Sequence, residues 1–258
     1  MTDRPLGTLP LPPAGPLEAI SETSDAVFNW QYDVDRLGKP TDRDEWFLPP
    51  HTVNAYYNPT FNEIVFPAAI LQPPYFDPHA DPAVNYGGIG GVIGHEMSHG
   101  FDDQGAKSDE KGVLRNWWRP DDERAFKKLV DALVTQYGGY EALPGLKLNG
   151  RLTAGENIGD LGGLTVAYQA YHMSFGDKPA ATIDGFSGDQ RFFLAWAQAW
   201  RELQRDASLR NQVISNPHSP GVFRVQGVVR NMDEWYQAFD VKPEDKLFLP
   251  PEQRVHIW

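Results

Sequence analysis

The chain has 258 residues, 41% of them hydrophobic and 12% aromatic, which is enough material for one large core or two closely joined lobes. Its formal net charge of −12 argues against a nucleic-acid partner, because binding to phosphates requires clustered Lys and Arg. The absence of cysteine excludes disulfides, thiolate nucleophiles and cysteine-ligated zinc.

The N-terminal segment, residues 1–27, opens with "MTDRPLGTLPLPPAGP", and this proline content is typical of an extended arm. We expect the folded domain to occupy residues 28–258. The opening lacks the basic and apolar regions of a signal peptide, and no run of about 18 apolar residues occurs. The sequence therefore predicts a cytoplasmic protein without a membrane partner, with secretion as the less favoured alternative.

The first regular structure is predicted in "TVNAYYNPTFNEIVFP", which begins at Thr52. Two short β-prone runs flank Asn58-Pro59-Thr60, and this pattern predicts a hairpin. After a proline-rich loop, "NYGGIGGVIGHEMSHGFDD" carries apolar residues at helical spacing and predicts a helix.

Four more helices are predicted further along the chain. The first, "RPDDERAFKKLVDALVTQYGG", has Pro120 at its first position, acids in its first turn and glycines at its end. The others are "GENIGDLGGLTVAYQAYHMSF", "DQRFFLAWAQAWRELQRD" and, after a loop at "NPHSPGVFR", the short "NMDEWYQAFD". We expect a mainly helical α+β fold with one small antiparallel sheet.

The stretch "GHEMSHG" places His95 and His99 four residues apart, on one face of a helix, where both imidazoles can bind one metal ion. Glu96 lies one residue round the helix, beside that face, and suits a general base that takes a proton from water. The alternative is a solvated helix face that carries these side chains by chance. Five glycines between positions 87 and 94 argue against it, because they would cost an exposed helix about 4–5 kcal/mol without compensation.

A third ligand is expected from another helix. "TAGENIGDLGG" offers Glu156 and Asp160 on one face, where Asp160 could accept the second ring N–H of a metal-bound histidine. The alternative is a capping box in which Glu156 pairs with Thr153. The glycines of this stretch favour the metal role, because they allow a second helix to approach.

Several separate stretches resemble the catalytic region of the neprilysin family of zinc metalloendopeptidases. They are "VNAYYNPTFNEIVFPAAILQPPYFD", "NYGGIGGVIGHEMSHGFDDQG", "GENIGDLGGL", "HSPGVFR" and the terminal Trp258. The resemblance extends from about Phe28 to the C-terminus, with the motifs in the family's order. It implies a thermolysin-like core with a small antiparallel sheet beside the HExxH helix.

The resemblance also implies roles that spacing alone does not give. It makes His95, His99 and Glu156 the ligands of one zinc ion per chain. It makes Glu96 the general base and Asp160 the residue that orients His95.

On the substrate side, the resemblance implies that Asn54 and the backbone of Ala55 hold the peptide as an added edge strand on the hairpin. His218 would donate to the oxyanion, and Arg224 would bind the carbonyl of the residue after the scissile bond. A hydrophobic pocket for that residue's side chain would be lined by Ile70, Tyr75, Val92 and Trp200.

These roles predict a zinc-dependent endopeptidase that cleaves peptides or unfolded proteins on the amino side of large hydrophobic residues. One alternative is a zinc-binding but proteolytically inactive domain that binds peptides. An aminopeptidase would need an acidic anchor for the substrate's amine, and a structural zinc site would need a fourth protein ligand. Neither is found in the sequence.

Members of the family are much longer and carry a helical lid ahead of the region seen here. We expect this chain to lack the lid, either as a natural reduced form or as a fragment. The apolar face left uncovered would then be packed by residues 1–27 or buried in a homodimer.

Overall fold

The computed structural model describes residues 17–175 and 180–258 and divides into two compact units, Met1–Trp46 and Phe47–Trp258. In the first unit, α1 spans Leu17–Arg36, and Arg36 Nη2 forms an ion pair with Glu45 Oε2 at 2.7 Å. The expected extended arm ended at residue 27, whereas α1 runs through that boundary and the larger unit begins at Phe47. The sequence of α1 contains neither glycine nor proline, which explains why it is helical. The arm's first 16 residues lie outside the described residues.

The predicted hairpin is present. Strands β1 (Tyr56–Asn58) and β2 (Glu63–Val65) pair antiparallel, with Tyr56 opposite Val65 and Asn58 opposite Glu63. Asn54 and Ala55 are the two residues directly before β1, so the expectation that they lie on the hairpin is wrong. A second antiparallel pair, β3 (Glu141–Leu143) with β4 (Leu146–Lys147), was not predicted.

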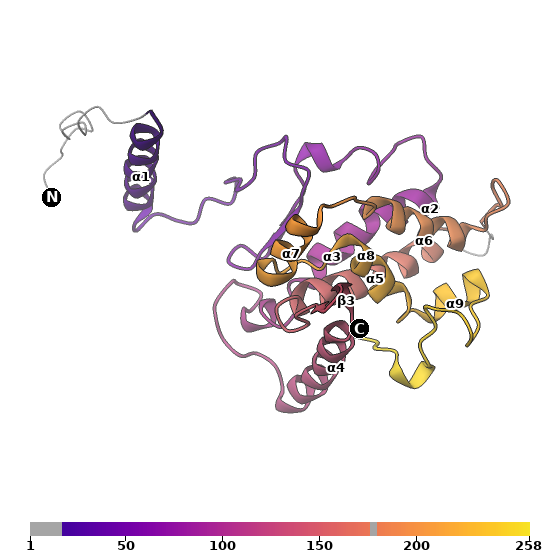
Figure 1. The fold of residues 1–258 in the computed structure, drawn as a ribbon. Helices are drawn as coiled ribbons and strands as arrows, with labels where there is room; N and C mark the ends of the chain where they lie inside the picture. Colours follow the sequence, from indigo (N-terminus) through magenta and orange to yellow (C-terminus); the bar gives the residue numbers. More distant parts are fainter. Residues whose placement is uncertain (1–16, 176–179) are drawn as a thin grey trace, which may run out of the picture. The chain divides into compact units, whose positions relative to one another are not determined.

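Most of the regular secondary structure of the larger unit is helical (Figure 1). The expected helix around the histidine motif is made of α2, the π-helical turn η3 and α3. Two further helices, α7 and α8, were not predicted, and α6 ends seven residues before its predicted end. The bounds of these helices are α2 Pro82–Asn85, η3 Tyr86–Gly90, α3 Gly91–Ser98, α4 Pro120–Gly138, α5 Ala154–Phe175, α6 Gly188–Ala199, α7 Asp206–Ser215, α8 Gly221–Val229 and α9 Asp233–Phe239. The described part of the chain also contains three short 3-10 turns, η2 Ala68–Ile70, η4 Gly105–Lys107 and η5 Pro251–Gln253.

The packing of α3 against α5 positions the candidate site. A Cβ atom at Gly94 would lie 2.4 Å from the carbonyl oxygen of Gly163, and one at Gly163 would lie 2.2 Å from the backbone nitrogen of His95. The two backbones are therefore in direct contact, as the glycines predicted. Helix α5 also packs against α4 and α8, so it lies at the centre of the larger unit.

The main core is formed by the buried faces of α4, α5, α6 and α8, with Trp196, Tyr137 and Tyr171 among its fully buried side chains. A smaller apolar cluster of Ala55 and Ile70 with two residues of the α3 region lies beside the hairpin. Among the described residues, no helix combines the length and the apolar composition needed to cross a membrane.

Candidate metal centre

His95 lies on α3 and His99 directly after its last residue, one turn further on. Their Nε2 atoms are 3.0 Å apart. His95 is 6% exposed, so its imidazole belongs to the interior rather than to a solvated helix face. The structure therefore brings the two histidines together as their spacing predicted.

Glu156 reaches the same point from the first turn of α5. Its Oε2 is 3.4 Å from His95 Nε2, and its Oε1 is 3.9 Å from His99 Nε2. The capping box is not formed, because the amide of Thr153 donates to the carbonyl oxygen of Asn149 at 3.1 Å. The carboxylate of Glu156 thus faces the histidines.

The three residues fit a zinc ion. Glu156 Oε2 is buried and accepts no well-oriented hydrogen bond among the described residues, although the Nε2 atoms of His218 and His95 lie 3.2 and 3.4 Å from it. A buried carboxylate oxygen of this kind is suited to bind a cation. Two imidazole nitrogens and one carboxylate are a donor set of catalytic zinc, which leaves one position open. Glu96 also places an oxygen within 4.8 Å of the imidazole nitrogens of His95 and His99. It lies one residue round the helix from His95, and burial raises the pKa of its carboxyl group.

Each histidine is oriented by a buried acid through its second ring nitrogen. Asp160 Oδ1 is 2.9 Å from His95 Nδ1, and Asp102 Oδ2 is 2.7 Å from His99 Nδ1. Asp160 was expected to orient His95, whereas Asp102 was not assigned a role. The signal was available, because an acid three residues after a histidine at a helix end lies within reach of its ring.

The charges around the site favour a cation. Burial lowers the pKa of His95, but the carboxylates of Asp160 and Glu156 outweigh it and raise this pKa to about 9. Burial raises the pKa of Glu156, but its contact with His95 holds the pKa at about 2. For Asp160, the guanidinium of Arg224 offsets burial and likewise holds the pKa at about 2. Both acids are therefore ionised at neutral pH.

A cleft of about 460 Å³ opens above these groups. It is lined by each of the residues expected to bind metal or substrate, and by Glu96 and His218, while Asp160 lies behind His95. Val53, Tyr56 and Tyr57 also line it and were not predicted. The expected residues in its wall are Asn54, Ala55, Ile70, Tyr75, Val92, His95, His99, Glu156, Trp200 and Arg224.

Arg224 is fixed by two contacts. On α8, its Nε and Nη2 donate to the two oxygens of Asp160 at 2.7 and 2.6 Å. Its guanidinium also lies over the ring of Trp200, 3.6 Å from the ring centre, and Trp200 in turn meets Tyr75 edge-on. This stacking joins the charged group to the apolar wall of the cleft.

His218 lies in the loop before α8, and its Nε2 is 3.2 Å from Glu156 Oε2. Its Nδ1 is 2.9 Å from Asn216 Oδ1, which also accepts the backbone N–H of His218 at 2.8 Å. Because that amide oxygen can only accept, Nδ1 carries a proton. Burial lowers the pKa of His218, and the charge of Glu156 works against that shift.

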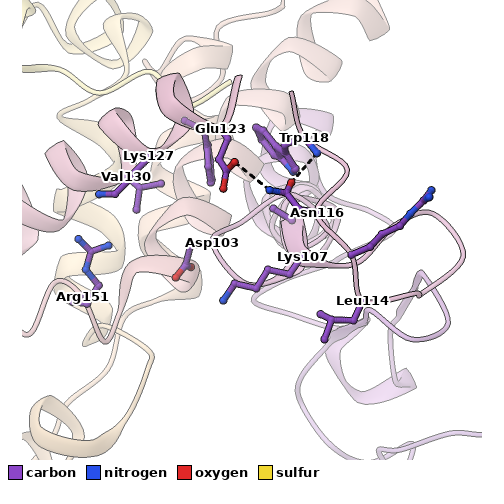
Figure 2. A pocket seen from close by; sticks show the side chains of 12 residues that line it. Asp103, Lys107, Leu114, Asn116, Trp118, Glu123, Lys127, Val130 and Arg151 are labelled. Atoms are coloured by element: carbon purple, nitrogen blue, oxygen red, sulfur yellow. Dashed lines mark hydrogen bonds between the residues drawn. The ribbon is translucent and has the colours of Figure 1, made fainter. Parts of the chain in front are cut away.

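A second cavity of about 500 Å³ lies between α4 and the segment before it (Figure 2). It is slightly larger than the cleft, but none of the predicted site residues lines it. Figure 2 shows Asn116 joined to Glu123 and to the backbone of Trp118 beside this cavity. The size of this second cavity does not by itself indicate a chemical role. The candidate metal ligands His95, His99 and Glu156 line the smaller cleft instead.

Two histidines of an HExxH helix and a glutamate of a second helix define a site of the zinc metallopeptidase type. The sequence profile of "Peptidase family M13" matches residues 54–255. Endothelin-converting enzyme 1 of Bos taurus is 42% identical over 234 residues, covering 90% of this chain and 31% of the relative. The neutral endopeptidase of Lactobacillus helveticus is 40% identical over 238 residues, covering 92% and 35%.

Solved structures agree with these sequence matches. Mycobacterium tuberculosis zinc metalloprotease Zmp1, in complex with an inhibitor, superposes with a TM-score of 0.87 at 56% identity, covering 89% of this chain and 36% of that one. The chain belongs to peptidase family M13, which confirms the resemblance to neprilysin. It spans about a third of the length of the curated relatives it matches.

Proposed function

We propose that this chain is the catalytic part of a zinc-dependent endopeptidase that holds one zinc ion and cleaves peptides before large hydrophobic residues. The observation that carries the proposal is the convergence of His95, His99 and Glu156 at the floor of the cleft, with Glu96 beside them. Membership of family M13 and the similarity to a zinc metalloprotease support the same reaction.

When bound by these three ligands, zinc supplies a Lewis acid that polarises a carbonyl group and acidifies water. Glu96 accepts the proton of the attacking water and passes it to the leaving amine. Its burial raises the pKa of its carboxyl group towards the working pH, which suits a group that first takes a proton and then gives it up.

His218 and Arg224 act on the substrate from the other side of the cleft. Once its Nε2 carries a proton, His218 donates to the developing oxyanion, and Asn216 keeps its ring oriented for this. Arg224 offers Nη1 to a substrate carbonyl, since Nε and Nη2 are engaged by Asp160.

The preference for a large hydrophobic residue rests on the apolar wall of the cleft. Ile70 and Val92 are 3% and 6% exposed, and Tyr75 and Trp200 meet edge-on beside them. A side chain that enters here loses contact with water and packs on aromatic rings, which favours Phe or Leu over a charged residue.

The test is turnover of a quenched-peptide library by the purified chain, with zinc removed by a chelator and then restored. We expect cleavage before Phe and Leu that disappears without zinc and returns with it. Glu96→Gln should bind zinc and peptide but lose turnover by at least about a hundred-fold. Zinc and peptide binding without any turnover by the unmodified chain would instead establish the alternative, an inactive peptide-binding domain.

A further inference from the structure

The loop that carries His218 is anchored to α5 by a series of buried hydrogen bonds. Ser219 Oγ donates to Asn157 Oδ1 at 2.8 Å, and Asn157 Nδ2 donates to Thr153 Oγ1 at 2.9 Å. Ser219 and Asn157 are each 1% exposed and Thr153 is 3% exposed. Water therefore cannot replace these bonds when one of them is lost.

Each end of this anchor adjoins a residue of the cleft. Asn157 follows Glu156 on α5, and Ser219 follows His218 in the loop. The side chain of His218 is 45% exposed, so surrounding atoms enclose only about half of it. Its position therefore depends on where the backbone of the loop is held, and Ser219 provides the buried attachment.

We propose that Ser219 and Asn157 are positioning residues that set the distance between His218 Nε2 and the metal ligand Glu156. This inference rests on the proposed function. Ser219 does not line the cleft, so it acts on substrate only through His218. Without its hydroxyl group, Asn157 Oδ1 would lose a buried partner and the loop would lose its attachment beside the site.

The same geometry explains why one hydroxyl group should matter for catalysis. A displacement of a catalytic group by about 1 Å can lower a rate on the order of a hundred-fold. His218 Nε2 lies 3.2 Å from Glu156 Oε2. A shift of about 1 Å would move His218 Nε2 beyond hydrogen-bonding distance of Glu156 Oε2. It would move the same nitrogen away from a substrate oxygen bound at this site.

The test compares Ser219→Ala with Tyr236→Phe. The control also removes one buried hydroxyl group, which donates to the carbonyl oxygen of Arg230 at 2.8 Å, accepts the backbone N–H of Leu249 at 2.9 Å and does not line the cleft. We expect Ser219→Ala to lower kcat by about ten- to a hundred-fold with little change in KM or zinc content. Tyr236→Phe should keep kcat within about two-fold, and Ser219→Cys, a weak donor of similar size, should fall between.

Two further measurements separate positioning from general damage. In a His218→Ala background, adding Ser219→Ala should cause no further loss of kcat, because the anchor acts through that imidazole. Hydrogen exchange of the zinc-loaded protein should accelerate about ten-fold in residues 216–222 for Ser219→Ala and stay unchanged for Tyr236→Phe.

Equal kcat values for Ser219→Ala and Tyr236→Phe would overturn the inference. So would a loss of kcat on Ser219→Ala that is as large in the His218→Ala background as in the unmodified chain. If the unmodified chain cleaves no peptide, the proposed function fails on that result alone. Hydrogen exchange then still decides whether Ser219 anchors the loop, and unchanged exchange in residues 216–222 would refute the anchor itself.

Discussion

Zinc binding to this site should depend steeply on pH, because a proton competes with the metal for His95. The pKa of His95 in the metal-free protein is raised to about 9 by Asp160 and Glu156, against the effect of burial. At pH 7 about 99% of the imidazole is therefore protonated, and zinc must displace that proton. Because half of the imidazole is still protonated at pH 9, the apparent zinc affinity should be about fifty-fold weaker at pH 7 than at pH 9, equivalent to about 2.3 kcal/mol.

The raised pKa of His95 also makes the stability of the fold depend on pH. A raised pKa means that protonated His95 stabilises the metal-free fold fully below pH 6.5, and that this contribution disappears as the pH rises through about 9. The metal-free protein should therefore lose this stabilisation over the same pH range in which its zinc affinity rises. Thermal unfolding with and without zinc at pH 7 and pH 10 would show the two trends with opposite signs.

The assay is competition between the protein and a chromophoric chelator from pH 6 to pH 10, with titration calorimetry in buffers of different ionisation enthalpy. Close to one proton should be released per zinc bound at pH 7 from His95. The Glu96→Gln variant should release the same proton, which would exclude Glu96 as its source. A zinc affinity that does not change between pH 7 and pH 9 would refute the assignment of the proton to His95.

Substitutions at Gly163, Asn216 and Trp200 test the geometry further. Gly163→Ala should destabilise the fold by about 2–3 kcal/mol in urea unfolding, because its Cβ would overlap the α3 backbone, whereas Gly138→Ala, with open space around it, should be neutral or slightly stabilising. Asn216→Ala should lower kcat about ten-fold by freeing the His218 ring, and Asn216→Asp, which keeps an acceptor, should retain most of the activity. Trp200→Ala should lower kcat/KM about ten-fold or more for peptides with Phe after the cleaved bond, but far less for those with Ala. Equal losses for both peptides would refute a role in the apolar pocket.

Local spacing predicted the parts of the site that lie within single turns of helix. The pair His95 and His99, and the pair Glu156 and Asp160, needed only the i, i+4 rule to be placed on common faces. Glycines on both helices predicted their close contact. The choice between a capping box and a metal ligand for Glu156 could not be made from sequence, because it depends on which partner α3 brings near.

The features that were missed depend on tertiary contacts. Pro217 and Pro220 indicated a loop, but the loop ends at Pro220, which is the N-cap residue of α8. The sequence pattern extended the hairpin back to Thr52, but only three residues of each strand pair. Ala55 therefore lies just before β1. Asp102 is the exception, because its contact with His99 is local, three residues along the chain, and could have been predicted from spacing.

The arrangement of α5 explains why the site can be built from loops and short helices. Three residues within two turns of α5 each contact a different part of the site. Glu156 contacts the histidines, Asn157 the His218 loop and Asp160 the side chain of Arg224. A helix fixes the separation of such residues at about 1.5 Å per residue along its axis. The proposed metal ligands, the proposed oxyanion donor and the proposed carbonyl-binding arginine are therefore spaced by one rigid element. The loop that carries His218 and the helix α8 that carries Arg224 need only be attached to α5, so residues of this one helix set the positions of groups that belong to other elements.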